Sequence, residues 1–248
     1  MNADHKKGII LGLGYVAGFY LKKNPHYVWT SRKLKENTEN SFYFDLLDKD
    51  SWKNIINFDD ILWTFPAVKN KNEIENCLTF FDLYLKNKNV IVLSTTSAYK
   101  SEIENEEINE NSKLNLDEPR IYAEEELRKK GALILHLSGI LGPERYPKNW
   151  YEKKRVKYGE NILNYIHVED IIYFTSKLFK NYKFYERFNL TSGDYKTHNQ
   201  ISKSLKYDAI FEFPNLTNGS KKVMNHKILE FLNENSYQFK KYPENCEI

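Results

Sequence analysis

The sequence predicts an α/β fold, a doubly wound parallel sheet followed by a small C-terminal region. Two observations lead to this prediction. Across the first two-thirds of the 248 residues, short β-branched or aromatic runs alternate with longer helical patterns. The short runs are apolar at almost every position, which suits strands covered on both faces. Strands that alternate with helices pair in parallel through right-handed crossovers, so helices cover both faces of one sheet.

The expected elements of the sheet follow one another in a regular order. Strands are expected at residues 8–13, 27–31, 42–46, 60–66, 90–95 and 132–139. Helices are expected at residues 15–23, 48–57, 71–87 and 118–130. The third of these helices has apolar residues at helical spacing, and we expect that face to pack against the core. These residues are Ile74, Leu78, Phe81 and Leu85.

The alternation of predicted strands and helices becomes less regular after Gly142-Pro143. Residues 146–161 are basic, aromatic and turn-rich, and they either hold an anionic group or lie in solvent. Further strands are expected at 161–167 and 187–194, and further helices at 168–179, 197–206 and 221–233. We therefore divide the chain into residues 1–145 and a smaller region, residues 146–248, packed on the first so that both form a single structural unit. Residues 101–118 carry seven acidic side chains and form either a solvated surface loop or a flap over a site.

Composition excludes several classes of protein. The 37 basic and 34 acidic side chains nearly balance, so the charge does not predict binding to nucleic acid. Cys77 and Cys246 form neither a disulfide framework nor a metal-binding spacing, and no metal site is expected. No apolar run is long enough for a signal peptide or a membrane span. The sequence therefore predicts a soluble, cytoplasmic protein with no membrane or nucleic-acid partner.

The segment GLGYVA, residues 12–17, fits the pattern G-x-G-x-x-G/A between a predicted strand and a predicted helix. Gly12 permits a tight turn, Gly14 lets a pyrophosphate approach the backbone, and Ala17 allows the helix to pack close to the strand. The pyrophosphate would then lie on the positive end of the helix. The alternative is a plain strand–turn–helix. We expect a dinucleotide to contact Gly12, Gly14, Tyr15 and Val16.

The end of the second strand indicates which dinucleotide binds. An NAD-binding unit usually has Asp or Glu about 20 residues into the motif, where it binds the ribose 2′-hydroxyl. Here that position is Arg32, within TSRK, and no acid is near. A cation and the two hydroxyls of Thr30 and Ser31 suit a 2′-phosphate better, so we predict NADP rather than NAD. The alternative is that Arg32 and Lys33 point into water.

Further motifs follow in a fixed order along most of the chain. They are FDLLD (44–48), WTFPAV (63–68), LSTTSAY (93–99), SGILGPER (138–145), YIHVEDI (165–171) and FNLTSGD (188–194). With the glycine segment, these motifs resemble the short-chain dehydrogenase/reductase superfamily, in its atypical or extended, NAD(P)-dependent epimerase/dehydratase-like branch. The resemblance implies a Rossmann fold with a small C-terminal substrate-binding region. It also implies that Asp45 and Leu46 contact the adenine and that Phe65 and Pro66 border the cofactor.

The chemistry of this family runs through a hydroxyl residue, a Tyr about 25 residues later and a Lys four residues after the Tyr. The resemblance places Thr95 at the hydroxyl position and Tyr122, 27 residues on, as the general acid or base. The Lys position is Glu126, and a carboxylate one turn below a phenol disfavours phenolate. Tyr122 therefore suits proton donation in ketone reduction, or is a surface Tyr at the start of a helix. Thr96, Ser97 and Arg145 are the residues expected to bind substrate.

Two functions follow from these residues. The first is an NADP-dependent oxidoreductase or epimerase-like enzyme that acts on a carbonyl or hydroxyl group of a small polar, sugar-like substrate. The second is a non-catalytic NADP(H)-binding protein, a redox sensor or scaffold that has lost the Tyr/Lys pair. Related proteins often pair through helices that flank the active site, so the resemblance also allows a homodimer.

Overall fold

A computed structural model describes residues 8–241. The chain forms two compact units that interleave along the sequence, whereas the sequence predicted one division at residue 145. The first unit combines the chain up to Ser94 with Asn115–His136 and Ile172–Arg187. The second unit combines Thr95–Leu114, Leu137–Ile171 and the chain from Phe188 onward.

The central sheet has seven strands in the order β10-β7-β5-β4-β1-β2-β3. The strands are β1 (Gly8–Leu11), β2 (Val28–Ser31), β3 (Ser41–Tyr43), β4 (Asp60–Trp63), β5 (Asn89–Thr95), β7 (Leu133–Leu137) and β10 (Arg187–Leu190). The pairs β1–β2, β1–β4, β2–β3 and β4–β5 are parallel. The predicted doubly wound parallel sheet is therefore confirmed.

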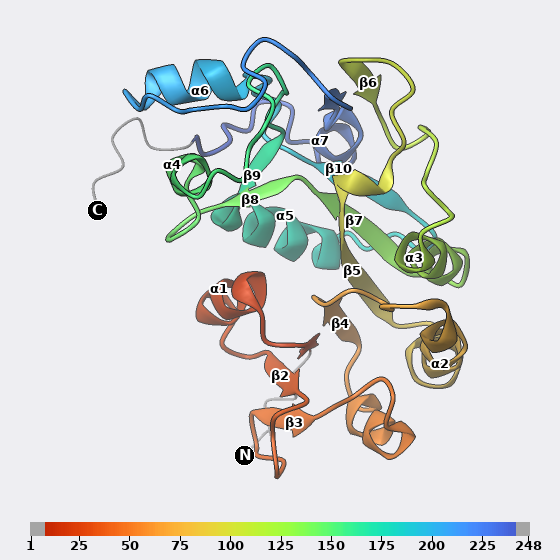
Figure 1. The fold of residues 1–248 in the computed structure, drawn as a ribbon. Coiled ribbons are helices and arrows are strands. Elements are labelled where there is room, and N and C mark those ends of the chain that lie inside the picture. Colours follow the sequence, from red (N-terminus) through yellow and green to blue (C-terminus); the bar gives the residue numbers. More distant parts are fainter. Residues whose placement is uncertain (1–7, 242–248) are drawn as a thin grey trace. The chain divides into compact units, whose positions relative to one another are not determined.

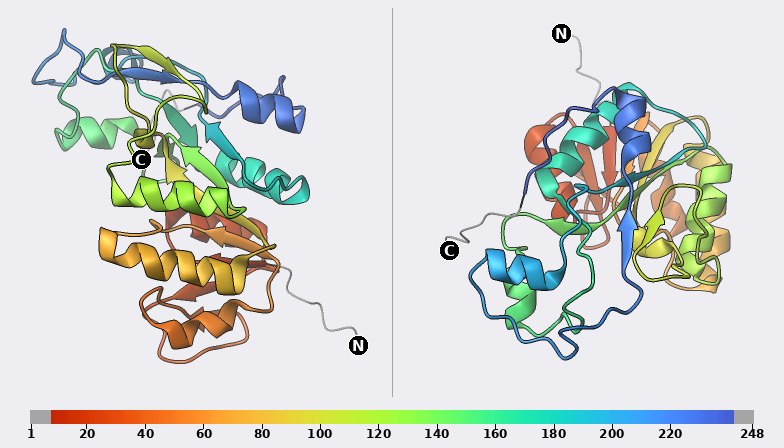
Figure 2. Two further views of the ribbon diagram at one scale, coloured as in Figure 1. Left: turned by 90° about the vertical axis from the view of Figure 1, so that its right-hand side faces the viewer. Right: turned by 90° about the horizontal axis from the view of Figure 1, so that it is seen from above.

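Helices cover both faces of the sheet in the first unit. Within this unit, α1 (Tyr15–Lys23) lies on one face, and α2 (Ile74–Phe80) and α3 (Pro119–Lys129) lie on the other (Figure 1). Figure 2 shows α2 and α3 side by side in front of the strands. Helix α5 (Val168–Lys180) runs from the second unit into the first. No described helix is long and apolar enough to cross a membrane.

Two predicted helices of the first unit differ from the observed ones. Residues 48–57 form a 3-10 helix, η1 (Lys49–Ile55). The Ser51 hydroxyl donates to the carbonyls of Asp45 (3.0 Å) and Asp48 (2.6 Å), and such local bonds compete with α-helical ones. The predicted helix 71–87 contains a 3-10 turn, η2 (Lys71–Glu73), then α2, and then a π-helical turn, η3 (Phe81–Leu85).

Aromatic packing fixes the segment that follows β3. The ring of Phe80 on α2 lies 5.0 Å from Phe44, 5.4 Å from Trp52 on η1 and 5.8 Å from Trp63 on β4, measured between ring centroids. All four side chains are almost completely buried. Because Phe44 is held in this cluster, the next residues of the chain leave the sheet at a defined point.

The second unit is built from short elements. They are β6 (Glu106–Ile108), β8 (Gly139–Leu141), α4 (Pro147–Glu152), β9 (Tyr165–His167), α6 (His198–Ser204), β11 (Lys221–Val223) and α7 (His226–Leu232). Strand β8 pairs with β9 and β6 pairs with β11, both in parallel. Its main apolar cluster gathers side chains from four of these elements, including Leu141, Tyr151, Tyr165 and Ile201.

Four expectations for this part of the chain are corrected. The acidic segment 101–118 is not only a loop, because it contains β6. Its Glu110 is buried and accepts a hydrogen bond from the Asn189 N–H (2.8 Å). The predicted helix 221–233 is split into β11 and α7, because two lysines of β11 lie opposite two glutamates of β6. The predicted strand 132–139 divides into β7 and β8, and the turn-rich segment 146–161 contains α4.

Candidate functional site

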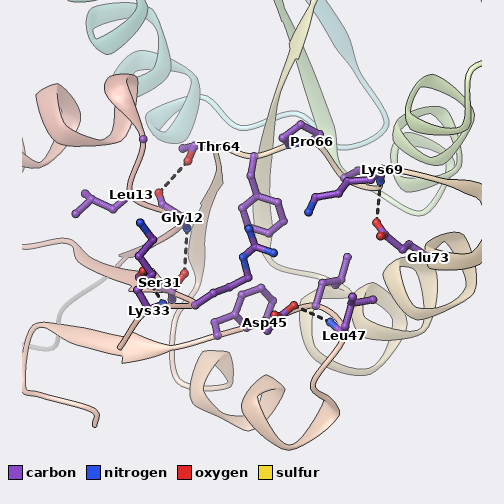
Figure 3. Close-up of a pocket in the computed structure, with 17 residues that line it drawn as sticks. Gly12, Leu13, Ser31, Lys33, Asp45, Leu47, Thr64, Pro66, Lys69 and Glu73 are labelled. Atoms are coloured by element: carbon purple, nitrogen blue, oxygen red, sulfur yellow. Dashed lines mark hydrogen bonds between the residues drawn. The ribbon is translucent and has the colours of Figure 1, made fainter. Parts of the chain in front are cut away.

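A cavity of about 540 Å³ lies in the first unit, where the chain leaves the carboxyl ends of β1, β2, β3 and β4 (Figure 3). In doubly wound sheets, this edge is where ligands bind. Eight of the ten residues predicted to contact the cofactor line this one cavity. They are Gly12, Gly14, Ser31, Arg32, Asp45, Leu46, Phe65 and Pro66. Tyr15 and Val16 lie next to it in the first turn of α1 and do not line it.

The turn at Gly12 is fixed by hydroxyl groups from two neighbouring strand ends. Its N–H donates to Thr30 Oγ1 (3.0 Å), and its carbonyl accepts from Thr64 Oγ1 (2.9 Å; Figure 3). The φ angle of Gly12 is +89°, and a Cβ there would lie 2.8 Å from a ring carbon of Phe65. Only glycine fits this backbone without strain.

The space at Gly14 is open. Gly14 precedes α1 with φ −104° and ψ −169°, and a Cβ there would meet no atom within 4 Å. No side chain caps the helix at this position and its first turn contains no acid, while Lys22 and Lys23 lie in its last turn. Ala17 is completely buried, so the helix packs closely at that point. The positive end of α1 therefore faces a space that an anion can enter.

The end of β2 presents a hydroxyl and two cations to the cavity. The Lys33 N–H donates to Ser31 Oγ (3.1 Å), which leaves the Ser31 hydroxyl proton available for a ligand oxygen. Arg32 and Lys33 are exposed and both line the cavity. Among the described residues, neither has a carboxylate within ion-pair distance. These groups suit a phosphate dianion better than a neutral hydroxyl.

The segment after β3 combines a fixed carboxylate with apolar surface. Asp45 Oδ1 accepts the Leu47 N–H (3.0 Å), so the carboxylate is held by its own loop. Phe44 and Leu46 are buried at the base of the cavity, whereas Leu47 is 56% exposed and, on the other side, Leu13 is 48% exposed. Exposed leucines beside a cavity provide flat apolar surface for a planar ring.

The Thr64 hydroxyl was not predicted, and the Thr30 hydroxyl, expected to meet a 2′-phosphate, is instead buried and accepts the Gly12 N–H. Thr30 and Thr64 each follow a tryptophan at the carboxyl end of a strand. The repeated Trp–Thr pair, Trp29-Thr30 and Trp63-Thr64, was a signal available in the sequence.

Lys69 and Glu73 were missed as well, because they lie beyond the strand and in no short motif. Lys69 extends toward the middle of the cavity, and its backbone N–H donates to Glu73 Oε2 (2.7 Å; Figure 3). The charged groups that line the cavity are Arg32, Lys33 and Lys69 against Asp45 and Glu73, so the net charge is 3 − 2 = +1. This balance favours an anionic ligand.

The predicted substrate residues lie in the second unit. Thr95 is half-buried and its Oγ1 lies 2.9 Å from Ser97 Oγ, so these two hydroxyls form one polar group. Thr96 is buried and Ser97 is exposed. Arg145 is exposed in a tight turn whose backbone bonds join it to Gly142 (2.9 and 3.3 Å).

Tyr122 lies on α3 in the first unit and is 42% exposed. Glu126, one turn further on, forms an ion pair with Lys129 (2.7 Å). The carboxylate at the position where the resemblance leads us to expect a lysine is thus paired within its own helix. Thr95 and Tyr122 belong to different units, so their joint action stays a prediction.

A buried polar cluster on α3 was not predicted. Glu124 is 2% exposed; its Oε2 accepts the Ser94 hydroxyl (2.5 Å) and its Oε1 accepts the Arg120 Nε–H (2.7 Å). Burial raises the pKa of the Glu124 carboxyl, and Arg120 and Ser94 oppose that shift. The run of three glutamates at 124–126 gave no sign of which one faces the core.

No model of a known protein family and no curated protein matches the sequence. Solved structures do match. A dTDP-glucose 4,6-dehydratase from Bacillus anthracis, solved in complex with NAD, is 14% identical with a TM-score of 0.71, over 96% of this chain and 93% of that one. A UDP-N-acetylglucosamine 4-epimerase from Bacillus cereus is 16% identical with a TM-score of 0.68, over 94% of each chain. A UDP-glucose 4-epimerase is 17% identical with a TM-score of 0.67, over 92% of each chain.

These structures are epimerases and dehydratases of the branch that the sequence motifs resemble. At such low identity the likeness shows the fold, and it confirms the Rossmann-type architecture predicted from the sequence. Since the match extends over more than nine-tenths of both chains, it includes the second unit as well as the sheet.

Proposed function

We propose that this protein binds NADP(H) in the cavity of the first unit and acts as an oxidoreductase or epimerase-like enzyme. Its substrate would carry a carbonyl or hydroxyl group and be small, polar and sugar-like. One observation carries the proposal: the open space at Gly14 lies at the uncapped positive end of α1, in the same cavity as Arg32. The named neighbours, two epimerases and a dehydratase solved with NAD, support the same class of reaction.

Each part of a dinucleotide can be assigned to residues that line the cavity. The diphosphate would lie at Gly12 and Gly14, against the first turn of α1. Leu46 and Asp45 would border the adenine, and Phe65 and Pro66 would border the ribose and diphosphate. The cavity of about 540 Å³ is in the size range of cofactor sites.

The end of β2 favours NADP(H) over NAD(H). A 2′-phosphate carries up to two negative charges and accepts hydrogen bonds only, which matches the Arg32 guanidinium and the Ser31 hydroxyl. No lining residue from β2 offers the carboxylate that would hold a free ribose hydroxyl. Lys33 adds a second cation at the same strand end.

A bound nicotinamide would supply the hydride that reduces the substrate carbonyl. The predicted role of Thr95 is to hold the carbonyl oxygen by a hydrogen bond, and that of Tyr122 is to donate a proton to it. Thr96, Ser97 and Arg145 are the predicted substrate contacts, with Arg145 directed at an anionic group. Because Glu126 replaces the family lysine, we expect reduction to proceed more readily than alcohol oxidation at neutral pH.

Binding of the cofactor tests the first half of the proposal. Titration of NADPH and NADH against the wild-type protein should show tighter binding of NADPH. Arg32→Ala should weaken NADPH binding by about tenfold or more and leave NADH binding nearly unchanged, because one charge-assisted contact contributes about 1.5–3 kcal/mol. Lys22→Ala, which removes an exposed cation from the far end of α1, is the matched control. Equal binding of both dinucleotides, unchanged in Arg32→Ala, would contradict the choice of NADP(H).

Turnover tests the second half. Wild-type protein and Tyr122→Phe should be compared with NADPH and a panel of carbonyl compounds that includes keto sugars and their nucleotide derivatives. Activity in the wild type that is lost in Tyr122→Phe supports the predicted proton donor. Tight NADPH binding without turnover of any compound would favour the second candidate, a redox sensor or scaffold, for which the missing lysine is the supporting observation. A cytoplasmic location and a homodimer stay predictions.

A further inference from the structure

The turn before β11, residues 217–220, is bound to two other segments of the second unit. On one side, Asn161 Oδ1 accepts the Asn218 N–H (2.8 Å) and Asn161 Nδ2 donates to the Asn218 carbonyl (3.2 Å). On the other side, Glu104 Oε1 accepts the Gly219 N–H (3.0 Å). The backbone on both sides of the bond between Asn218 and Gly219 is therefore held in place.

The Glu104 carboxylate accepts more than one hydrogen bond from this turn. Hydrogen bonds from the Thr217 hydroxyl and from the backbone of Gly219 and Ser220 hold the pKa of the exposed Glu104 carboxyl below its ordinary value. The Ser220 carbonyl also accepts the Asn105 N–H (2.7 Å). Because the carboxylate stays charged at neutral pH, it remains an acceptor for the Gly219 N–H. The acidic segment 101–118 thus binds this turn.

The turn contains the only Asn–Gly pair of the sequence, Asn218-Gly219. Both residues are exposed, Gly219 has φ +63°, and a Cβ there would meet no atom within 4 Å. No described residue bonds the side-chain amide of Asn218. Because glycine lacks a Cβ, its backbone nitrogen can approach the side-chain carbonyl carbon of the asparagine before it. This approach is the first requirement for deamidation.

We propose that Asn218 is a modification site, where the protein deamidates at a rate that the Glu104 contact sets. The Gly219 nitrogen attacks Asn218 Cγ. The new N–Cγ bond replaces the Cγ–Nδ2 bond, and ammonia leaves with the proton that the Gly219 nitrogen loses, so a cyclic imide forms. Water then opens this imide at either carbonyl. One opening gives aspartate, and the other gives isoaspartate, in which the backbone runs through Cγ.

The Glu104 contact slows the first step. The attacking nitrogen must lose its proton, and a carboxylate that accepts this N–H opposes the loss, because a negative charge then lies beside the forming anion. Ring closure also requires Asn218 to turn about its own backbone, which the two bonds from Asn161 resist. Deamidation therefore requires the turn to leave Glu104 in a local opening, and exposed loops open at low cost in free energy.

Either product alters the start of β11. Lys221, the first residue of β11, lies opposite Glu106 of β6 and follows Gly219 by two positions. Aspartate adds a negative charge beside Glu104, whereas isoaspartate lengthens the backbone and moves the Gly219 N–H away from its acceptor. We expect the pairing of β6 with β11 to weaken, most in the isoaspartate form. Hydrogen exchange of the β11 amides in fresh and aged protein measures this effect, and equal exchange would contradict it.

Incubation of the protein in mildly alkaline buffer tests the proposal without substrate or cofactor. Peptide mass spectrometry follows the conversion of the Asn218 amide into an acid, and fragmentation distinguishes aspartate from isoaspartate. The wild type should deamidate at Asn218 more slowly in native buffer than in urea. Glu104→Ala should speed the reaction in native buffer by roughly three- to tenfold, the factor that corresponds to the loss of one hydrogen bond. Glu104→Gln, which keeps an acceptor without the charge, should lie between the two.

Two controls separate this effect from a general change in the protein. Glu107→Ala removes a carboxylate of the same segment that makes no bond to the turn, and its rate at Asn218 should match the wild type. Asn235, which is exposed and precedes a serine, should react at one rate in every variant.

The outcomes that overturn the proposal are distinct. An equal or slower rate at Asn218 in Glu104→Ala would remove the role of Glu104. If Glu104→Ala does not fold, the wild type decides: a rate in native buffer equal to that in urea would show that the folded turn gives no protection. No product at Asn218 even in urea would show that it is not a modification site.

Discussion

Two glycines of the first loop have different physical requirements. The fold itself requires Gly12, because its φ is +89° and a Cβ would lie 2.8 Å from the ring of Phe65. The fold does not require Gly14, since its backbone is in a region open to any residue and the space around it is empty. The proposed diphosphate gives Gly14 a role, because a side chain there would enter the space that the diphosphate occupies.

Substitution of these two glycines should therefore have opposite effects. Gly12→Ala should lower the free energy of unfolding by about 1–3 kcal/mol, because it forces a strained backbone against Phe65. Gly14→Ser should leave stability unchanged or slightly raised, because serine is a favourable N-cap, yet weaken NADPH binding at least tenfold by occupying the phosphate space. Denaturant unfolding and NADPH titration of both variants measure these effects. A Gly14→Ser protein that binds NADPH like the wild type would show that no phosphate lies there.

His198 should make the stability of the protein depend on pH. Burial lowers its pKa from 6.5 to about 4 in the folded state, where Tyr151 Oη lies 3.2 Å from its Nδ1. Because the folded-state pKa is below the unfolded value, the contribution of His198 is fully present above pH 6.5. It is lost as the pH falls toward 4, by up to about 3 kcal/mol. Urea unfolding at several pH values should show that the free energy of unfolding falls less between pH 6.5 and 4 in His198→Gln than in the wild type. An equal dependence on pH in the two proteins would contradict the assignment.

At the scale of elements, a single lysine, Lys88, binds the segment that connects η1 to β4. Lys88 Nζ donates to the carbonyls of Ile56 (2.5 Å) and Phe58 (2.6 Å). Both residues lie just after the 3-10 helix η1. Burial lowers the pKa of Lys88, yet the ammonium donates to both carbonyls. This contact holds the start of β4, and β4 leads directly to Thr64 and Phe65 in the cavity.

Lys88→Met keeps the apolar stem and removes the donor. We expect the free energy of unfolding to fall by about 1–3 kcal/mol, because two hydrogen bonds from a charged donor are lost, one of them partly buried. Lys86→Met, two residues earlier and exposed, should change stability by less than about 0.5 kcal/mol. Thermal and urea unfolding of both variants provide the comparison. Equal stability of the two variants would show that the Lys88 contacts contribute nothing.

Elements with a strong apolar or glycine pattern were predictable, and short ones were not. Helix α1 has the predicted bounds 15–23, because a glycine turn precedes it and Asn24-Pro25 ends it. Strands β6 and β11 have only three residues each, and the residues that pair lie more than 100 positions apart along the chain. No local pattern predicts such a contact. For the same reason Glu124 was missed, since only the orientation of α3 against Ser94 distinguishes it from Glu125 and Glu126.

At the scale of the molecule, the two units interleave along the chain. The first unit needs Ile172–Arg187 as well as its N-terminal part. In that segment the Tyr182 hydroxyl donates to the carbonyl of Val90 (2.9 Å) and accepts the Val90 N–H (3.0 Å). Both backbone polar groups of this β5 residue are thus bonded to one side chain. Phe179 lies 6.1 Å from Tyr27 between ring centroids and covers the end of α1. These contacts tie residues 172–187 to Val90 on β5 and to Tyr27 just before β2.

Truncation tests this interleaving. A fragment of residues 1–145, the predicted first domain, lacks Tyr182 and Phe179 and would expose the apolar face of β5 and Tyr27. We expect it to show no cooperative unfolding and no NADPH binding, because buried backbone groups of Val90 would lose their partners. A fragment of residues 1–187 contains every segment of the first unit and should regain dispersed amide signals in NMR spectra. Both fragments should be compared with the full chain by urea unfolding followed by tryptophan fluorescence. If residues 1–145 unfold cooperatively and bind NADPH, the boundary at 145 is the true domain limit, and the segment 172–187 only packs against a unit that folds without it.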